Sequence, residues 1–296
     1  MPDDVKTRYG IAEWYGKDFT SLNASQREDF AKQALGETDA EPPRCPFQPT
    51  QPPCSKRGGV CSIQRYKEGE NSRIGARLDS PVITCPRRFE ESGLINKWLA
   101  ETAGFPLDET EVASEVPFMR STETEKPAGK IDMIVAHVAG DSMTWHGLEI
   151  QAVYFSGTGM TSEFEALRDD NNDPPPYPTA VRRPDWRSSS AKRLMPQLEI
   201  KAPTLRRWGA KIAVAVDRPF FEAVGGASAQ HSHDLNEGDI IWLVARLKRT
   251  PPGTWELIRD HWEVLTLEDS KMRLQAAETV SREHFEEALK SRFRPL

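Results

Sequence analysis

Three polar side chains interrupt two neighbouring apolar stretches in the middle of the chain. Asp132 lies in the stretch 131–138, Glu149 and Gln151 lie in the stretch 145–155, and 16 residues separate Asp132 from Glu149. Both stretches have the composition of strands, so Glu149 and Gln151 are expected to share one face. A carboxylate on a buried strand is costly unless it is paired or binds a cation. Two carboxylates and an amide on neighbouring strands therefore suit Mg²⁺ and the hydrolysis of phosphodiesters, in which a metal stabilises phosphate charge and activates water.

A second segment spells a similar motif more completely. Asp185, Glu199 and Lys201 form the pattern P-D-x13-E-x-K, which has the same acids and adds a lysine. Its setting is less suitable, because Pro196 and Pro203 flank Glu199 and proline is poorly tolerated inside a central strand. Acids among so many basic residues are also natural partners for ion pairs. We therefore expect the active site at Asp132 rather than at Asp185.

The segment 181–211 is strongly basic although the chain is acidic. It holds nine basic and two acidic side chains, a local charge of +7, whereas the whole chain has a net charge of −6. Such a segment attracts a polyanion, and its arginines have the donors needed to read guanine in the major groove. A solvated basic helix face is the alternative interpretation. The candidates for DNA contact are Arg182, Arg183, Arg187, Lys192, Arg193, Arg206 and Arg207.

All four cysteines of the chain lie in its N-terminal third. Cys45, Cys54, Cys61 and Cys85 follow the spacing C-x8-C-x6-C-x23-C, and the stretch 40–60 around the first two is rich in proline and glycine. Four thiols in a segment with little core of its own favour a structural metal, either iron or zinc, that would order the region. Unrelated buried thiols are the alternative, because the spacing lacks the paired C-x2-C of common zinc sites.

The remaining pattern predicts a mixed α/β fold. Strands are expected at 131–138, 145–155, 211–216, 239–248 and 255–265, and helices at 23–35, 89–103, part of 189–208 and 281–290, with a proline-rich loop at 169–178. The N-terminus has no apolar signal segment, and no apolar run approaches the roughly 20 residues of a membrane span, so we expect a cytoplasmic protein.

Several motifs in the same order resemble the NotI-type restriction endonucleases. They are Ile11-Ala-Glu-Trp-Tyr-Gly16, Cys45-Pro-Phe47, Gly59-Val-Cys61, Thr84-Cys-Pro86, the strand with Asp132, and the block from Leu148 to Gly157. The resemblance covers most of residues 11–160 and continues more diffusely over 189–217. Cysteine blocks followed by an E-x-Q strand are far more specific together than either is alone.

The resemblance implies a PD-(D/E)xK nuclease core in its E-x-Q variant, a mixed sheet flanked by helices. It implies that Asp132 and Glu149 hold Mg²⁺, that Gln151 orients the attacking water, and that the four cysteines hold iron in an N-terminal domain. We expect that domain at 1–90 and the nuclease at 91–296.

The same resemblance implies a type II restriction endonuclease of a prokaryotic cell. The enzyme would be a homodimer that cuts both strands of a GC-rich palindromic site in duplex DNA, and a cognate DNA methyltransferase would protect that site. The main alternative is a DNA-binding regulator without catalysis, stabilised by a structural zinc site. An electron carrier with thiolate-bound iron leaves the E-x-Q strand without a role.

Overall fold

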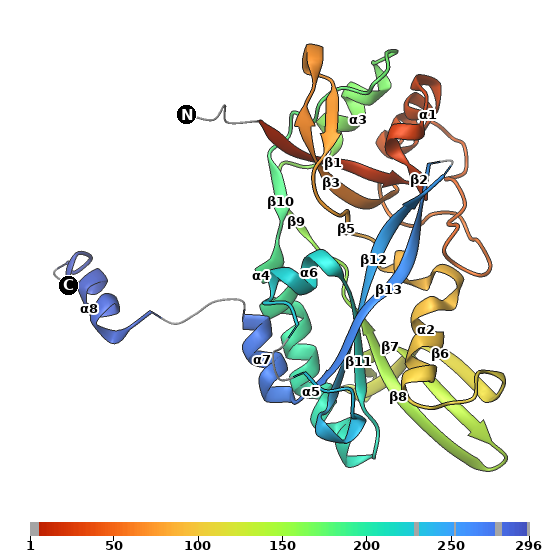
Figure 1. Cartoon of the computed structure of the whole chain (residues 1–296), viewed down its shortest axis with the longest axis vertical. Helices are drawn as coiled ribbons and strands as arrows, with labels where there is room; N and C mark the ends of the chain where they lie inside the picture. Colours follow the sequence, from red (N-terminus) through yellow and green to blue (C-terminus); the bar gives the residue numbers. More distant parts are fainter. Residues whose placement is uncertain (1–5, 228–230, 252, 276–279, 295–296) are drawn as a thin grey trace.

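A computed structural model describes residues 6–227, 231–251, 253–275 and 280–294. Within these residues, a mixed sheet in the order β13-β12-β11-β8-β7-β6 forms the larger half of the molecule (Figure 1). Its strands are β6 (Thr110–Arg120), β7 (Pro127–Ala139), β8 (Ser142–Ile150), β11 (Ile212–Asp217), β12 (Ile240–Thr250) and β13 (Thr254–Leu265). β7 and β8 form an antiparallel hairpin, while β11 runs parallel to both β8 and β12.

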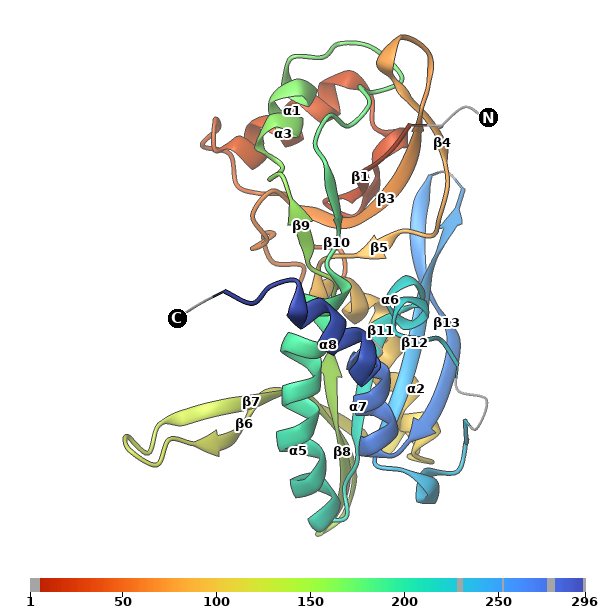
Figure 2. The same cartoon turned by 90° about the vertical axis from the view of Figure 1, so that its left-hand side faces the viewer.

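Helices cover both faces of this sheet, which explains the unbroken apolar run of β11. One face packs against α2 (Leu94–Thr102) through Ile95, Trp98 and Leu99. The other face packs against a group of several helices, and Leu198, Leu205 and Phe220 lie in the apolar core between these helices and the sheet (Figure 2). That group comprises α4 (Trp186–Ser189), a π-helical turn (Ser190–Leu194), α5 (Met195–Arg207), α6 (Arg218–Ala223) and α7 (Leu267–Gln275). The mixed sheet flanked by helices fits a restriction-endonuclease-like core.

A smaller antiparallel sheet forms the other half of the molecule, at the top of Figure 2. Its strands are β1 (Thr7–Trp14), β2 (Lys17–Asp18), β3 (Val60–Glu68), β4 (Ile74–Arg77) and β5 (Val82–Ile83). α1 (Ala24–Leu35) and α3 (Thr161–Arg168) pack on it, and Phe164 and Leu167 of α3 share an apolar cluster with Trp14 of β1. β9 (Phe155–Gly157) and β10 (Arg182–Pro184) lead the chain to α3 and back.

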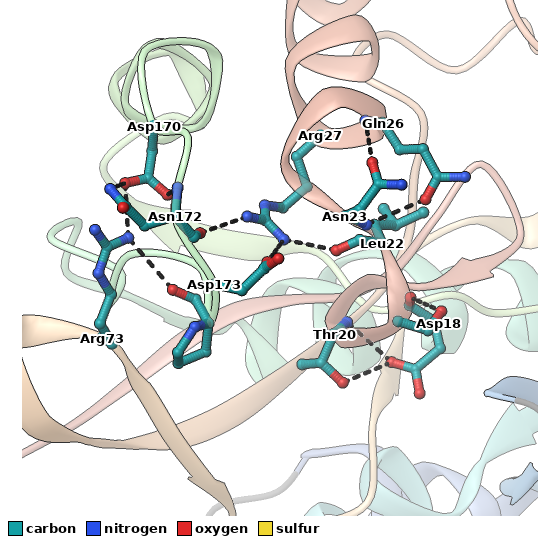
Figure 3. Close-up of polar contacts among 12 residues, drawn as sticks. Asp18, Thr20, Leu22, Asn23, Gln26, Arg27, Arg73, Asp170, Asn172 and Asp173 are labelled. Carbon is teal, nitrogen blue, oxygen red and sulfur yellow. Dashed lines mark hydrogen bonds and ion pairs between the residues drawn. The ribbon is translucent and has the colours of Figure 1, made fainter.

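Buried arginines hold this smaller half together. Arg27 of α1 is fully buried, and its guanidinium donates to the backbone oxygens of Leu22 and Asn172 and lies 2.7 Å from Asp173 (Figure 3). A buried cation is costly unless it is paired and hydrogen-bonded, and the two terminal nitrogens of Arg27 make these contacts. The predicted loop at 169–178 is therefore fixed to α1 rather than free.

A second buried arginine joins the two halves. Arg88 lies in a 3-10 helical segment (Pro86–Gly93), and its Nε donates to both carboxylate oxygens of Glu13 on β1 at 3.1 Å. Its Nη2 donates to the backbone oxygen of Trp255 on β13 at 2.9 Å. Both Arg88 and Glu13 are fully buried, so the pair fixes the smaller sheet against the edge of the larger one.

Most predicted elements are confirmed, with shifted ends. The helix expected at 23–35 begins at Ala24, and Asn23 caps it in a capping box with Gln26. The helix expected at 89–103 is a 3-10 segment up to Gly93 and an α-helix only from Leu94, because Ser92 and Gly93 have left-handed backbone angles. The strand expected at 145–155 ends at Ile150 as β8.

The C-terminal helix is confirmed as α8 (Arg282–Lys290), with Ser281 as its N-cap. Short 3-10 turns lie at Phe19–Ser21, Glu70–Ser72, Leu107–Glu109 and Leu235–Glu237. No helix in the described ranges is long and apolar enough to cross a membrane. The division of the chain at residue 90 stays a prediction, and α3 belongs in space with the elements that precede that division.

Candidate active site

The β7–β8 hairpin brings the two predicted acids together. Its register pairs Met133 with Leu148, so Asp132 and Glu149 are adjacent on neighbouring strands. The Oδ2 atom of Asp132 accepts a hydrogen bond from the backbone N–H of Ile150 at 2.9 Å, and Oε1 of Glu149 accepts one from the N–H of Asp132 at 3.4 Å. Each carboxylate is thus held by the backbone of the opposite strand, a rigid setting for a metal ligand.

A lysine from α5 completes this site. Lys201 Nζ lies 2.6 Å from Glu149 Oε1 and 2.9 Å from Gln197 Oε1, and the lysine is buried. Leu198 and Leu205 pack α5 against the sheet, and this packing places Lys201 over Glu149. The sequence assigned Lys201 to the Asp185 motif, so the cation of the Asp132 site was missed. The signal that could have found it is a lysine at a position where the apolar face of a helix continues.

Burial and like charge make this site receptive to a cation. Burial and, to a smaller extent, the neighbouring Asp132 carboxylate raise the pKa of Glu149 to about 7, against the opposing effect of Lys201. Burial also raises the pKa of Asp132, against the hydrogen bond from Ile150 and the charge of Lys201. Two carboxylates with raised pKa values bind a divalent cation in exchange for protons and are stabilised by it.

Gln151 lies just beyond β8 and continues its path. Its backbone N–H donates to the Ala215 oxygen of β11 at 3.0 Å, and its side-chain nitrogen donates to the Ala152 oxygen. Gln151 lines the same cavity as Asp132, whereas Glu149 lies behind them against Lys201. The structure therefore brings the predicted trio to one place, where Asp132 and Gln151 line the cavity and Asp132 is the more exposed of the two.

The cavity beside these residues has a volume of about 790 Å³. Asp132 and Gln151 line it together with residues from distant parts of the chain. The later part of the chain contributes Tyr154, Lys192, Arg193 and Gln197, and the N-terminal part contributes Cys45, Cys54, Lys56, Cys85 and Arg87. The acids, one end of the basic segment and the cysteine region thus share one cavity.

The structure separates the residues of the competing motif. Asp185 caps α4, where its Oδ1 accepts from the N–H of Ser188 at 2.9 Å. Glu199 is exposed on α5 and pairs with Lys271 of α7 at 2.7 Å. Residues two apart on a helix point about 200° apart, so Glu199 and Lys201 face different surroundings. The Asp185 motif matches the consensus more completely in sequence, but its residues do not lie together in space.

The basic segment does not form one continuous surface. Arg182 is only 5% exposed and forms a buried ion pair with Glu163 of α3, so it faces the protein interior. Arg183, Arg187, Lys192 and Arg193 are exposed near the cavity end of the segment, and the Arg193 guanidinium stacks on the ring of Tyr154 at 3.7 Å. At the other end of α5, Arg206 lies 3.3 Å from Asp239, and Arg207 is exposed.

The four cysteines are free thiols that backbone contacts bring into two pairs. The N–H of Cys45 donates to the Pro52 oxygen and that of Cys54 to the Pro43 oxygen, so the two segments pair across a turn with these cysteines on either side of the bridge between Arg44 and Pro53. The N–H of Cys85 donates to the Cys61 oxygen at 3.2 Å. Within the described residues, no three histidine, cysteine or acidic side chains are arranged to hold a metal ion.

Neighbouring thiols nevertheless influence one another. Burial raises the pKa of the Cys54, Cys61 and Cys85 thiols, and for each of them another cysteine adds to the rise. Cys45 contributes to the rise at both Cys54 and Cys85. The two pairs are therefore close enough in space for their charges to interact, and their donor chemistry suits a soft metal.

Comparison with known proteins agrees with this geometry. The family model described as restriction endonuclease NotI matches residues 29–257, which contain all four cysteines, both acids and the whole basic segment. No curated protein matches the chain. The match covers more than half of the sequence and favours the enzyme over the DNA-binding regulator. The chain belongs to the NotI restriction endonuclease family and is a site-specific deoxyribonuclease, a type II restriction enzyme that cuts DNA.

Proposed function

We propose that the chain hydrolyses phosphodiester bonds with Mg²⁺ held by Asp132 and Glu149. The observation that supports this most is that each carboxylate is fixed by a backbone N–H of the neighbouring strand, beside a large cavity. The carbonyl oxygen of Ile150, which lines the same cavity, would supply a third contact. When bound, the ion would neutralise charge on the scissile phosphate and lower the pKa of a bound water.

Gln151 would orient the attacking water. Its side chain lines the cavity with Asp132, so its amide oxygen is available to accept a hydrogen bond from that water. An amide positions by hydrogen bonds alone and supplies no charge. These contacts support the PD-(D/E)xK core in its E-x-Q variant as the fold of residues 91–296.

The substrate in this proposal is duplex DNA with a GC-rich palindromic site. Lys192 and Arg193 line the cavity, and Arg183 and Arg187 are exposed earlier in the same segment. These side chains would contact phosphates, and the arginines among them can read guanine O6 and N7. Arg206 and Arg207 would meet the backbone further along. Arg182 is excluded from this surface by its ion pair with Glu163.

Cleavage of both strands of a palindrome calls for two active sites related by a two-fold axis. We propose that two copies of the chain supply them as a homodimer, each with its own Asp132 site. A cognate methyltransferase that modifies the same site would protect the DNA of the host cell.

The cysteines would hold one structural metal, iron or zinc. Backbone hydrogen bonds bring the segment of Cys45 next to that of Cys54, and Cys61 next to Cys85. Residues 1–90 around them form the proposed N-terminal domain. Elemental analysis of folded protein should find about one equivalent of iron or zinc per chain. Folded, active protein that contains neither metal would refute this role.

The catalytic proposal is tested with DNA of known sequence. Incubation with Mg²⁺ should give discrete fragments whose ends map to one site, whereas Ca²⁺ should support binding without cleavage. Asp132→Ala protein should still bind the DNA and leave it intact. Cleavage by Asp132→Ala protein at the rate of the parent would place the active site elsewhere.

A further inference from the structure

Lys201 is a buried cation that the E-x-Q motif does not account for. It lies on α5, 52 residues after Glu149, and its two oxygen partners are Glu149 at 2.6 Å and Gln197 at 2.9 Å. The neighbours of Lys201 on the buried side of α5 are Leu198, Ala202 and Leu205. An apolar residue would fill this position at lower cost, because a buried lysine is costly unless it is paired with an acid and hydrogen-bonded. Packing alone therefore does not explain a lysine here.

The two contacts of Lys201 have different consequences. At Glu149, the ammonium holds Oε1, which fixes the carboxylate beside Asp132. At Gln197, it holds the amide oxygen, so the amide nitrogen is the end of that side chain left to donate. Gln197 lines the cavity with Asp132 and Gln151, and its amide nitrogen donates to no described residue.

We propose that Lys201 is a positioning residue for DNA cleavage that acts through Glu149 and Gln197. It orients Glu149 to hold the divalent cation, and it turns the Gln197 amide so that its NH₂ group donates to a phosphate oxygen of the bound strand. Lys201 thus supplies from a helix the cation that Gln151 cannot supply from the strand. This inference rests on the proposed function, because it assigns partners to the same metal site.

The test compares Lys201→Met with a matched lysine, Lys271→Met. Lys271 also pairs with a glutamate of α5, Glu199 at 2.7 Å, but lies outside the site. Loss of a residue that orients a metal ligand costs about 10- to 100-fold in metal affinity or activity. Lys201→Met should weaken Mn²⁺ binding, measured by calorimetry without DNA, by about 10-fold or more, and should slow single-turnover cleavage by about 100-fold.

Affinity for DNA measured without metal should stay within about 3-fold of the parent, because the phosphate contacts that dominate it remain. Lys201→Arg should recover part of both losses, since a guanidinium can keep the contact with Glu149. Lys271→Met should leave Mn²⁺ binding and cleavage unchanged. A Lys201→Met protein that binds Mn²⁺ and cleaves like Lys271→Met would overturn the inference.

A second variant keeps the test decisive if Lys201→Met does not fold. Gln197→Leu removes only the amide and leaves Lys201 beside Glu149. It should slow cleavage by about 10-fold with unchanged Mn²⁺ affinity, and an unchanged rate would refute the role given to the Gln197 amide.

The proposed function is tested separately by Glu149→Gln. If Glu149→Gln leaves Mn²⁺ binding and cleavage intact, the metal site itself is wrong. If Glu149→Gln abolishes both but Lys201→Met changes neither, only the role of Lys201 is wrong.

Discussion

Strand β8 and helix α5 carry the same spacing of chemical groups with opposite results. Glu149 and Gln151 lie two residues apart at the end of β8, and Glu199 and Lys201 lie two residues apart on α5. The extended chain keeps Glu149 and Gln151 together beside Asp132, whereas the helix turns Glu199 to solvent and Lys201 to the interior. Two residues that are two positions apart therefore share one face on a strand, whereas on a helix they point to different surroundings.

The surroundings of the two glutamates differ as much as their directions. Glu149 is buried between Asp132 and Lys201, and its pKa is raised to about 7. Glu199 is exposed and pairs with Lys271 on the surface, where an ion pair is worth little. The secondary-structure element thus decides whether a glutamate is buried with a raised pKa, which favours binding of a cation, or exposed in a weak surface ion pair.

The largest difference should appear when the two aspartates are exchanged for alanine. Asp132→Ala should reduce Mg²⁺-dependent cleavage by about 1,000-fold or more, because a ligand of the cation is lost. Asp185→Ala should leave cleavage detectable, because its side chain only caps α4, a contact worth about 1 kcal/mol of stability. Cleavage of a site-bearing plasmid measures the rates. Loss of activity in Asp185→Ala with normal activity in Asp132→Ala would reverse the comparison.

Gln151→Ala should show that the residue two positions after Glu149 takes part in cleavage. This change should slow single-turnover cleavage by about 100-fold, because it removes the amide that is proposed to orient the water beside Asp132. Specific binding should persist, measured by gel shift in Ca²⁺. Glu199→Ala, a truncation to alanine on the exposed face of α5, serves as the control and should cleave at the parental rate.

A pH series should show the difference in the environments of the two glutamates. Metal binding requires ionised Glu149, whose pKa is about 7 without metal, so Mn²⁺ affinity should fall about tenfold for each pH unit below 7. Above pH 8 the affinity should level off, because the carboxylate is then fully ionised. Calorimetry from pH 5.5 to 8.5 measures the trend. A Glu199→Gln protein should follow the parental curve, and a flat parental curve would contradict the raised pKa.

The smallest expected effect distinguishes the two ends of the basic segment. Replacing Lys192 and Arg193 with alanine should flatten the slope of log K against log salt by about two units, because both lie at the cavity where the strand must pass. Replacing Arg206 and Arg207 should flatten it by less, since Arg206 already pairs with Asp239. Fluorescence anisotropy at several salt concentrations measures both slopes. Equal slopes for the two double variants would mean that the DNA follows the whole of α5.

The local sequence pattern predicts the strands that carry Asp132 and Glu149 better than it predicts the residues that contact them. The apolar stretches around Asp132 and Glu149 specify a hairpin, and the hairpin register alone brings the acids together. Pro196 and Pro203 correctly excluded a central strand, and both lie within α5, where Pro196 occupies the first turn. These features are encoded by residues close together in the chain.

Contacts across long separations were not predictable in the same way. The contact of Lys201 with Glu149 depends on how α5 packs against β11, and nothing near either residue specifies that packing. The burial of Arg182 depends in the same way on Glu163 of α3. Charge counting treated both cations as surface residues, because it contains no information about which face of the segment is covered.

The path of the chain through α3 has a consequence for the order of folding during synthesis. When the ribosome has made the first 90 residues, the strands β1, β3 and β5 exist, but Phe164, Leu167 and the partner of Arg27 at Asp173 do not. The apolar face that α3 covers stays open until the chain has been made beyond Arg168, the last residue of α3, and Arg27 lacks its partner until Asp173 follows. The residues of the β7–β8 hairpin, Asp132 and Glu149 among them, are made before α3, so the N-terminal half of the molecule can close only after the hairpin sequence has been synthesised.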